Sequence, residues 1–297
     1  MKPITIVVAS DDNYLVLLAA LINSIELNLK EGYSIDLWVI EDNVSEANKE
    51  KLKSSINAAI TQLHWQSMNE VIPKGIDLPL DRSSYPLNIY MRLFIPYFIP
   101  SQVEKVLYLD VDMIVQKDIS TLYATDLGDA LVGAVLDPRI ISFDNSWGGI
   151  LNYEELGLDA KTRYFNTGLL LIPTKKWLEE NIPVRIINCI KENKKFANYP
   201  DQYGMNVVLA NQWLALDPLW NHFCTIDHPN PYLIHFVQRK PIFKSYSNNR
   251  DYQKIFYQYL CNTAWKNERP RGESGRYIKK IKNIMDKILK QLGWGSH

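Results

Sequence analysis

Two aspartates separated by one residue, Asp110 and Asp112, directly follow an apolar stretch over residues 103–109. Neighbouring carboxylates repel each other and are costly to desolvate, so a divalent cation is their natural partner. Two further apolar stretches also run into acidic residues, which are Asp11 with Asp12 and Asp137. This pattern predicts a metal site, although an Asp-x-Asp pair taken alone fits a solvated β-turn equally well.

The acidic residues follow segments that have the composition of buried β-strands. We expect strands at 4–8, 35–40, 60–65, 103–109, 131–136 and 168–172. Apolar residues at steps of three and four over 15–29 predict a helix, and Ser45 is a favourable N-cap for a second one. Alternating strands and helices predict an α/β fold with a parallel sheet covered on both faces. Because ligands bind beyond the carboxyl ends of such strands, the acidic residues should meet at one edge.

The composition excludes several classes of protein. Of the 297 residues 46% are hydrophobic and 22% are charged, which is typical of a globular chain. Lys plus Arg and Asp plus Glu both total 33, so the overall charge predicts no nucleic-acid partner. Three widely spaced cysteines argue against a disulfide scaffold and fit a reducing cytosol. No signal peptide or membrane span is recognisable, so a cytoplasmic protein is expected.

Short motifs along the chain occur together, in order, in one known family. They are SDDNY at 10–14, YMR at 90–92, LYLDVD at 107–112, YFNTG at 164–168, PDQ at 200–202, LWN at 219–221 and IHFVQRKP at 234–241. Over roughly residues 3–245 the sequence resembles the glycosyltransferases of family 8. That family implies a GT-A fold, with a mostly parallel Rossmann-like sheet, and a retaining transfer of sugar from a nucleotide sugar. Bacterial lipooligosaccharide α-galactosyltransferases, glucosyltransferases and glycogenin are relatives.

The resemblance implies a metal and a donor for this site. Asp110, Asp112 and His235 would hold Mn²⁺, with Mg²⁺ as the alternative, because carboxylate oxygen plus imidazole suits these ions better than Ca²⁺. The donor would be a UDP-hexose, either UDP-galactose or UDP-glucose. The residues implied in donor binding are Ser10, Asp11, Asn13, Tyr14, Arg92, Asp110, Val111, Asp137, Asn166 and Lys240. Lys240 would neutralise the leaving diphosphate, with Arg239 as a second candidate for that contact.

The resemblance also implies the catalytic residues, Gln202 and Asp201. Gln202 would lie near the anomeric carbon and is a poor nucleophile, which favours a front-face reaction. Asp201 is the candidate nucleophile for a double displacement. Two departures from the family pattern, Tyr203 in place of a second acid and Gln238 in place of a glycine, leave an alternative open. This alternative is a catalytically weak sugar-nucleotide-binding or scaffold protein.

A haloacid-dehalogenase-type phosphatase is a further alternative, since it also places Asp-x-Asp after a strand. Such a phosphatase normally carries the motif near the start of its core domain, whereas here about a hundred residues of β/α units precede Asp110.

The end of the chain has a different composition from the rest. We expect a catalytic domain at 1–265 and a hinge with a basic amphipathic helix at 266–297. From Arg276 to His297 six basic residues and one acidic residue occur, a net charge of +5. The apolar residues of one helical face are Ile278, Ile281, Ile284, Met285, Ile288, Leu289 and Leu292, with Trp294 just beyond.

Such a helix favours an anionic membrane surface at the inner face of the plasma membrane. The alternative is that its apolar face packs on the catalytic domain. A membrane location would suit a glycan, glycolipid or glycoprotein acceptor in cell-envelope synthesis.

Overall fold

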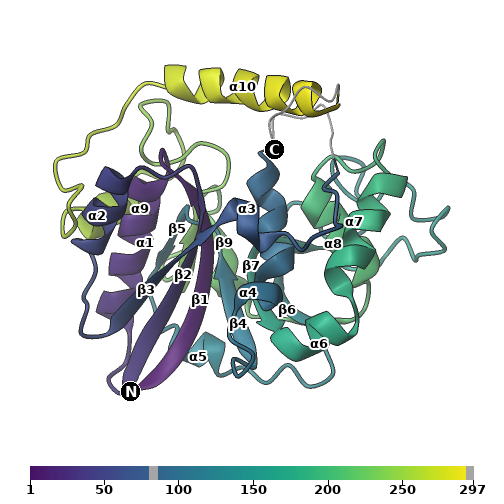
Figure 1. The fold of residues 1–297 in the computed structure, drawn as a ribbon, viewed down its shortest axis with the longest axis horizontal. Coiled ribbons are helices and arrows are strands. Elements are labelled where there is room, and N and C mark those ends of the chain that lie inside the picture. The colour runs from purple at the N-terminus through teal and green to yellow at the C-terminus, as the bar shows by residue number, and fades with distance from the viewer. Residues whose placement is uncertain (80–85, 292–297) are drawn as a thin grey trace.

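A seven-stranded sheet forms the centre of the computed structural model, which describes residues 1–79 and 86–291 (Figure 1). Its strands are β1 (Lys2–Asp11), β2 (Tyr33–Asp42), β3 (Thr61–Ser67), β4 (Lys105–Leu109), β6 (Val132–Leu136), β7 (Phe165–Pro173) and β8 (Trp213–Ala215). They lie in the order β3-β2-β1-β4-β7-β6-β8. Every strand predicted from the sequence is present, with bounds that differ by at most three residues at either end.

All strands of this sheet except β7 run in the same direction. β1 pairs in parallel with β2 and β4, β2 with β3, and β6 with β8. β7 lies between β4 and β6 and is antiparallel to both. A mostly parallel sheet is therefore confirmed, but the expected parallel strand at 168–172 belongs to a reversed strand. As a consequence, the first residues of β7 lie beside the carboxyl ends of β4 and β6.

Helices cover both faces of the sheet (Figure 1). One face carries α1 (Leu15–Asn28) and α9 (Arg250–Leu260). The other carries η1 (Leu87–Phe94), α4 (Ile95–Phe98), α6 (Thr174–Glu179), α7 (Ile182–Glu192) and α8 (Pro200–Val208). The remaining short helices are α2 (Glu46–Lys53), α3 (Met68–Val71), α5 (Ser120–Tyr123) and η2 (Pro218–Asn221). Ser45 caps α2 as predicted, since its hydroxyl accepts the Asn48 N–H at 3.4 Å.

A small second sheet brings a distant segment of the chain to Asp112. Its strands are β5 (Met113–Val115), β9 (His222–Phe223) and β10 (Leu233–His235), in the order β5-β10-β9. β10 is antiparallel to β5 and pairs His235 with Met113. The Phe236 N–H also donates to the Asp112 carbonyl at 2.8 Å. The ladder therefore sets His235 next to the Asp-x-Asp segment.

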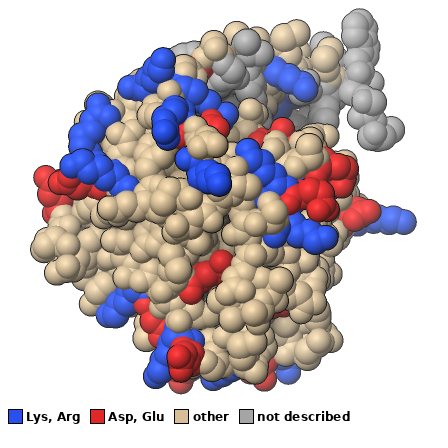
Figure 2. Space-filling view, turned by 90° about the vertical axis from the view of Figure 1, so that its left-hand side faces the viewer, with Lys and Arg blue, Asp and Glu red and all other residues tan. Residues whose placement is uncertain are grey.

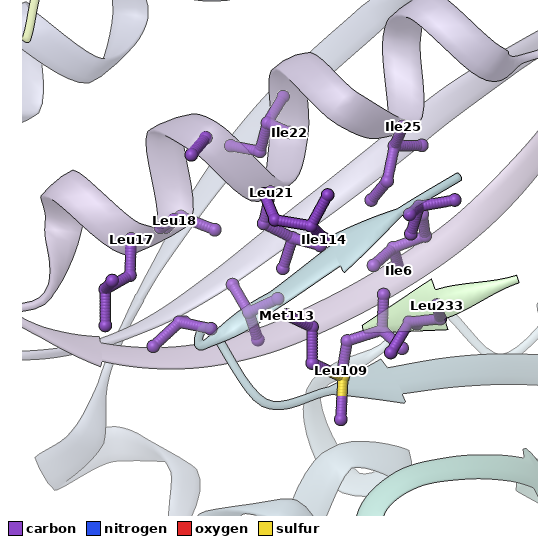
Figure 3. Close-up of a cluster of buried hydrophobic side chains, with 14 of the residues drawn as sticks. Ile6, Leu17, Leu18, Leu21, Ile22, Ile25, Leu109, Met113, Ile114 and Leu233 are labelled. Atoms are coloured by element: carbon purple, nitrogen blue, oxygen red, sulfur yellow. The ribbon is translucent and has the colours of Figure 1, made fainter. Parts of the chain in front are cut away.

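The helix α1 holds β5 in place through an apolar face (Figure 3). Leu21 and Ile25 of α1 face Ile114 of β5, and all three side chains are almost completely buried. Burial of an aliphatic side chain of this size contributes about 1.5–3 kcal/mol. Ser24 of α1 adds a polar anchor, because its hydroxyl accepts the Val115 N–H at 2.9 Å. The core thus fixes the position of β5, the strand that follows Asp112.

The last helix, α10 (Ser274–Gln291), lies across the top of the molecule in Figure 1. It begins four residues before the predicted helical face, while Leu292 and Trp294 lie outside the described residues. The segment before it is bound to the chain after β10: the Arg271 N–H donates to the Ile242 carbonyl at 2.9 Å. Within the described ranges no helix is both long and apolar enough to cross a membrane.

Candidate active site

The predicted acidic strand ends lie at the carboxyl edge of the sheet. β1 ends at Asp11, and Asp110 and Asp137 directly follow β4 and β6. Gly168 of β7 lets these groups approach closely, since a Cβ there would lie 2.6 Å from the His235 ring and 3.0 Å from Asp110 Oδ2. The Gly168 carbonyl also accepts the Asp110 N–H at 2.8 Å. Any larger residue at this position would displace the side chains of the site.

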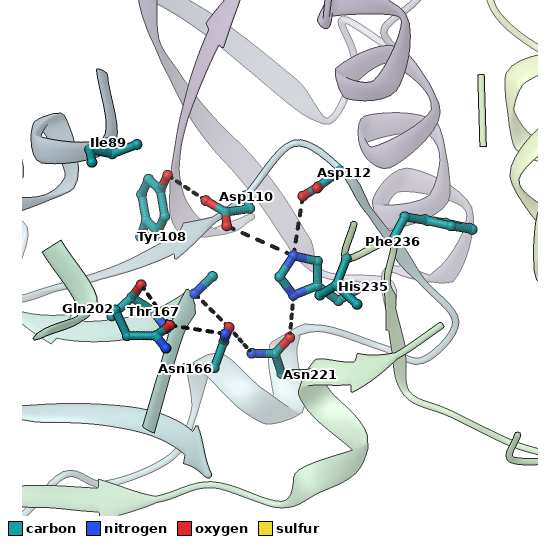
Figure 4. Close-up of polar contacts among 12 residues, drawn as sticks. Ile89, Tyr108, Asp110, Asp112, Asn166, Thr167, Gln202, Asn221, His235 and Phe236 are labelled. Carbon is teal, nitrogen blue, oxygen red and sulfur yellow. Dashed lines mark hydrogen bonds and ion pairs between the residues drawn. The ribbon is translucent and has the colours of Figure 1, made fainter. Parts of the chain in front are cut away.

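Asp110, Asp112 and His235 form a cluster that could hold a metal ion (Figure 4). One ligand atom from each lies within 4.8 Å of the others. His235 Nε2 is 3.4 Å from Asp112 Oδ1 and 3.9 Å from Asp110 Oδ2. Two carboxylates and one imidazole make a donor set that fits a divalent cation.

The orientation of the His235 ring is fixed by Asn221 (Figure 4). His235 Nδ1 lies 2.8 Å from Asn221 Oδ1, and the Asn221 amide nitrogen donates to Asn166 Oδ1 at 2.8 Å. Because an amide oxygen only accepts, this chain of hydrogen bonds puts the imidazole proton on Nδ1. The Nε2 lone pair then faces the two aspartates, as a metal ligand requires.

Lys240 supplies the positive charge nearest to this cluster. Its ammonium donates to Asp112 Oδ2 and, at 2.9 Å, to the Phe236 carbonyl. Burial opposes the ionisation of Asp112, but the Lys240 ammonium outweighs it and holds the pKa of the carboxyl well below its usual range. Arg239 does not share this position, since its guanidinium pairs with Glu273 at 2.6 Å. Of these two adjacent cations, Lys240 is therefore the one that lies at the cluster.

A buried arginine joins the aspartates of two motifs. Arg92 Nη2 lies 3.1 Å from Asp110 Oδ1, and Arg92 Nε lies 3.5 Å from Asp201 Oδ2. Its Nη1 donates to the Thr167 carbonyl at 2.5 Å. Burial raises the pKa of Asp201, and the Arg92 charge opposes that shift. Arg92 thus stabilises two carboxylates that would otherwise be costly to bury.

A network of amides and one carboxylate surrounds Gln202 and Asn166 (Figure 4). Gln202 Oε1 accepts from the Asn166 amide at 3.1 Å and from the Thr167 N–H at 3.2 Å. The Gln202 amide nitrogen and the Asn166 amide both donate to Asp137 Oδ2, at 3.4 and 3.2 Å. The network, called the Gln202 network below, brings together Gln202 with Asp137 and Asn166, two residues that the resemblance implies in donor binding, and it fixes the Gln202 side chain.

The predicted nucleotide loop follows β1. Asp11 Oδ1 accepts the N–H groups of Asn13 and Tyr14 at 2.7 and 3.1 Å, which shapes the turn into α1. The Ser10 hydroxyl donates to the Asp11 carbonyl at 3.1 Å, and Val111 is buried between the two aspartates of the Asp-x-Asp motif. These residues lie at the same sheet edge as the cluster.

The sequence is similar to those of known proteins over most of its length. Residues 5–256 match the family described as Glycosyl transferase family 8. The chain belongs to this family. General stress protein A of Bacillus subtilis (strain 168) is 25% identical over 281 residues, 88% of this chain and 94% of that protein. The lipopolysaccharide 1,2-glucosyltransferase of Escherichia coli (strain K12) is 26% identical over 294 residues, 93% of this chain and 83% of that protein.

A solved structure agrees with the fold of this family 8 member. The galactosyltransferase LgtC, in complex with donor and acceptor sugar analogs, superposes with a TM-score of 0.73 at 22% identity. The match covers 89% of this chain and 100% of that one. The fold is therefore GT-A, and family membership supports a retaining glycosyltransferase.

Sequence reasoning gave no role to Asn221, although it is part of the LWN motif. The LWN motif marks Asn221 as a residue to consider. Only the structure shows that the Asn221 amide contacts His235. Tyr203, one of the two departures from the family pattern, lies outside the site. Its ring is buried with Phe143 and Tyr164, and its hydroxyl donates to Asn152 Oδ1 at 2.8 Å. Tyr203 is thus part of the core and leaves the cluster intact.

Proposed function

We propose that this family 8 member is a metal-dependent retaining hexosyltransferase. It would transfer galactose or glucose from a UDP-sugar to a hydroxyl of a glycan, glycolipid or glycoprotein. The observation that supports this best is the cluster of Asp110, Asp112 and His235 beside the Lys240 ammonium. Carboxylates and an imidazole suit Mn²⁺, with Mg²⁺ as the alternative, and a lysine suits a diphosphate.

The residues of the chain would act on the donor as follows. A bound divalent cation would supply charge neutralisation at the diphosphate. The Lys240 ammonium would release Asp112, bind a phosphate oxygen of the donor in its place and so stabilise the leaving group. The bond from the anomeric carbon to the diphosphate breaks, a bond to the acceptor oxygen forms, and the acceptor proton passes to the leaving phosphate. Charge thus balances without an added base.

The contacts of Asp201 and Gln202 favour this front-face reaction. Asp201 is buried and is held by Arg92 at 3.5 Å and by the Thr167 hydroxyl at 3.3 Å. The Gln202 oxygen accepts two hydrogen bonds of its own. Gln202 therefore presents a fixed dipole toward the sugar rather than a nucleophile, and Asp201 remains the candidate for a double displacement.

Release of UDP from a panel of UDP-sugars tests the proposal. We expect UDP-galactose or UDP-glucose to be hydrolysed in the presence of Mn²⁺ and the reaction to stop with excess chelator. Binding of UDP without turnover of any sugar would support the scaffold alternative instead. Release of phosphate from a phosphomonoester would favour a phosphatase.

We further propose that α10 holds the protein on an anionic bilayer at the cytoplasmic face. Four of its apolar residues are exposed, since Ile281, Met285, Ile288 and Leu289 are each at least 38% accessible, whereas Ile284 is half-buried. Lys282 is exposed beside them, whereas Lys287 is buried. Figure 2 shows further Lys and Arg side chains in the upper half of the adjoining face, with Asp and Glu side chains among them. An exposed apolar face flanked by basic residues suits anionic headgroups.

Sedimentation with vesicles tests this proposal. The variant Ile281→Glu/Met285→Glu should lose most of its binding to phosphatidylglycerol vesicles, because it places acidic groups on the apolar face. Leu27→Glu is the matched control, since Leu27 is 62% exposed on α1. Equal sedimentation of both variants, or none for the unmodified chain at low salt, would contradict the membrane assignment.

A further inference from the structure

A pocket of about 570 Å³ opens beside the Gln202 network. Arg139, Trp147, Thr225 and Gln238 line it. Its volume lies within the range of small-molecule sites, about 300–1,000 Å³. The pocket is joined to the network through Asp137, whose Oδ1 accepts the Arg139 N–H at 2.9 Å while Oδ2 binds Asn166. A ligand in the pocket would therefore lie next to Gln202, the residue proposed to face the donor sugar.

Trp147 forms an exposed aromatic surface that the fold holds in place. Trp147 is 57% exposed, its backbone N–H donates to Asn145 Oδ1 at 3.0 Å, and its ring lies 6.0 Å from that of Tyr199. The turn that follows requires glycine at 149, since a Cβ there would lie 2.2 Å from the Phe143 carbonyl. An aromatic ring that is exposed to this extent contributes little to the core and is suited to stacking on a ligand.

The segment that carries Trp147 has an apolar core of its own. Ile140, Phe143, Ile150 and Tyr164 pack together there with Tyr203 of α8. The segment that forms this wall of the pocket is therefore packed by its own buried side chains and is not a loose loop.

Arg139 gives the pocket a positive charge that no carboxylate in the described ranges neutralises. None lies within the 4.0 Å ion-pair distance of its guanidinium. Its Nη2 donates to the Thr225 hydroxyl at 3.1 Å, and its guanidinium lies 5.4 Å from the centre of the Phe223 ring. The Gln238 amide, turned so that its oxygen faces Arg139, accepts from both terminal nitrogens at 3.0 and 3.2 Å.

The neutral groups around Arg139 fix its position without cancelling its charge. An arginine positioned in this way suits a carboxylate or a phosphate. Gln238, which stands where the family pattern has a glycine, is therefore one of the residues that orient Arg139.

We propose that this pocket binds the acceptor, and that the acceptor is a pyranose carrying a negatively charged group. The apolar face of the sugar ring would stack on Trp147, and its carboxylate or phosphate would bind Arg139. The inference rests on the proposed transferase function and adds the chemical class of the acceptor. It also gives a role to Gln238, which the donor site does not use.

Calorimetry with sugar probes tests the proposal on the full chain with UDP and Mn²⁺ present. The probes are p-nitrophenyl β-D-glucuronide, the neutral p-nitrophenyl β-D-glucoside, and glucose 6-phosphate. We expect at least one anionic probe to bind about tenfold more tightly than the glucoside, as a charged hydrogen bond would give. The glucuronide and the sugar phosphate distinguish a carboxylate from a phosphate as the recognised group.

Two variants separate stacking from charge recognition. Arg139→Met should remove the preference for the anionic probe, and Trp147→Ala should weaken both classes of probe. Arg163→Met and Tyr97→Ala are matched controls that should bind as the unmodified chain does: Arg163 lies over the Trp213 ring, and Tyr97 is 42% exposed on α4.

Equal binding of anionic and neutral probes, or a preference that survives Arg139→Met, would overturn the inference. Because probe binding requires no turnover, either outcome leaves the UDP-sugar assay to judge the transferase function separately.

Discussion

Replacement of Asp112 by asparagine should abolish metal-dependent turnover of the UDP-sugar. Asp112 is the aspartate closer to His235 Nε2, at 3.4 Å, and it also binds Lys240. Asparagine keeps the shape of the side chain but removes the charge that a divalent cation needs from its ligand. We expect a loss of about 10²–10³-fold in turnover, the scale seen when one electrostatic partner is removed. UDP release at saturating Mn²⁺ measures this loss.

The matched control is a surface pair of the same residue types. Asp251 binds Lys254 at 2.7 Å, and both side chains are more than 70% exposed. Asp251→Asn should therefore keep full turnover, because an exposed pair contributes little. Full turnover by Asp112→Asn, or by the unmodified chain in excess chelator, would show that the cluster holds no catalytic metal. A melting curve for each variant separates lost chemistry from lost structure.

The sequence predicted this site well where its residues are adjacent in the chain. The aspartates at 110 and 112 follow a buried strand, and the period of the apolar residues locates that strand without any tertiary information. The same reasoning locates Asp11 and Asp137 at strand ends. Parallel strands then require all of these ends to share one edge.

Contacts between distant segments could not be derived in this way. His235 reaches Asp112 only through the antiparallel pairing of β10 with β5, and short strands of three residues carry little periodic signal. The reversal of β7 was missed for a similar reason. A buried strand is apolar in either direction, so the composition of 168–172 says nothing about its orientation.

The side chains around the predicted residues were the hardest to anticipate. Arg239 and Lys240 are neighbours in sequence, yet Arg239 pairs with Glu273 and Lys240 with Asp112. The sequence alone cannot show which of two adjacent cations reaches the cluster, because this depends on where the segment before α10, which carries Glu273, lies. The same holds for Tyr203, which the helix α8 turns into the core instead of the site.

Replacement of Arg92 by methionine should give the largest loss of stability. The arginine side chain is 7% exposed, and it binds two carboxylates together with the Thr167 carbonyl. Removal of one partner from a buried ion pair costs about 3–5 kcal/mol, because the remaining charge is left unpaired. We expect this loss in the free energy of unfolding measured with urea. The free energy of unfolding of Arg92→Lys should lie between those of Arg92→Met and the unmodified chain. An ammonium keeps the charge, but it cannot bind both carboxylates as the planar guanidinium does.

The pH dependence of the loss distinguishes this cause from simple loss of packing. Burial already raises the pKa of Asp201, and without Arg92 that pKa should rise further. A carboxyl with a raised pKa in the folded state binds its proton more tightly there than in the unfolded state. Ionisation of this carboxyl therefore does not destabilise the folded state below the pKa that the group has in the unfolded chain. The destabilisation grows as the pH rises from that value through the pKa of the folded state. Arg92→Met should accordingly lose more stability at pH 8 than at pH 5.

A surface arginine provides the control for both parts of this prediction. Arg185 lies 3.6 Å from Glu180, and both side chains are at least 41% exposed. Arg185→Met should cost no more than about 1 kcal/mol, with little dependence on pH, because water solvates the glutamate that remains. An Arg92→Met variant that unfolds at the same urea concentration as Arg185→Met would mean that Asp110 and Asp201 are stabilised by other groups. A loss that is equal at pH 5 and pH 8 would assign the effect to packing of the arginine side chain against Tyr108, 4.6 Å from its ring centre, rather than to charge.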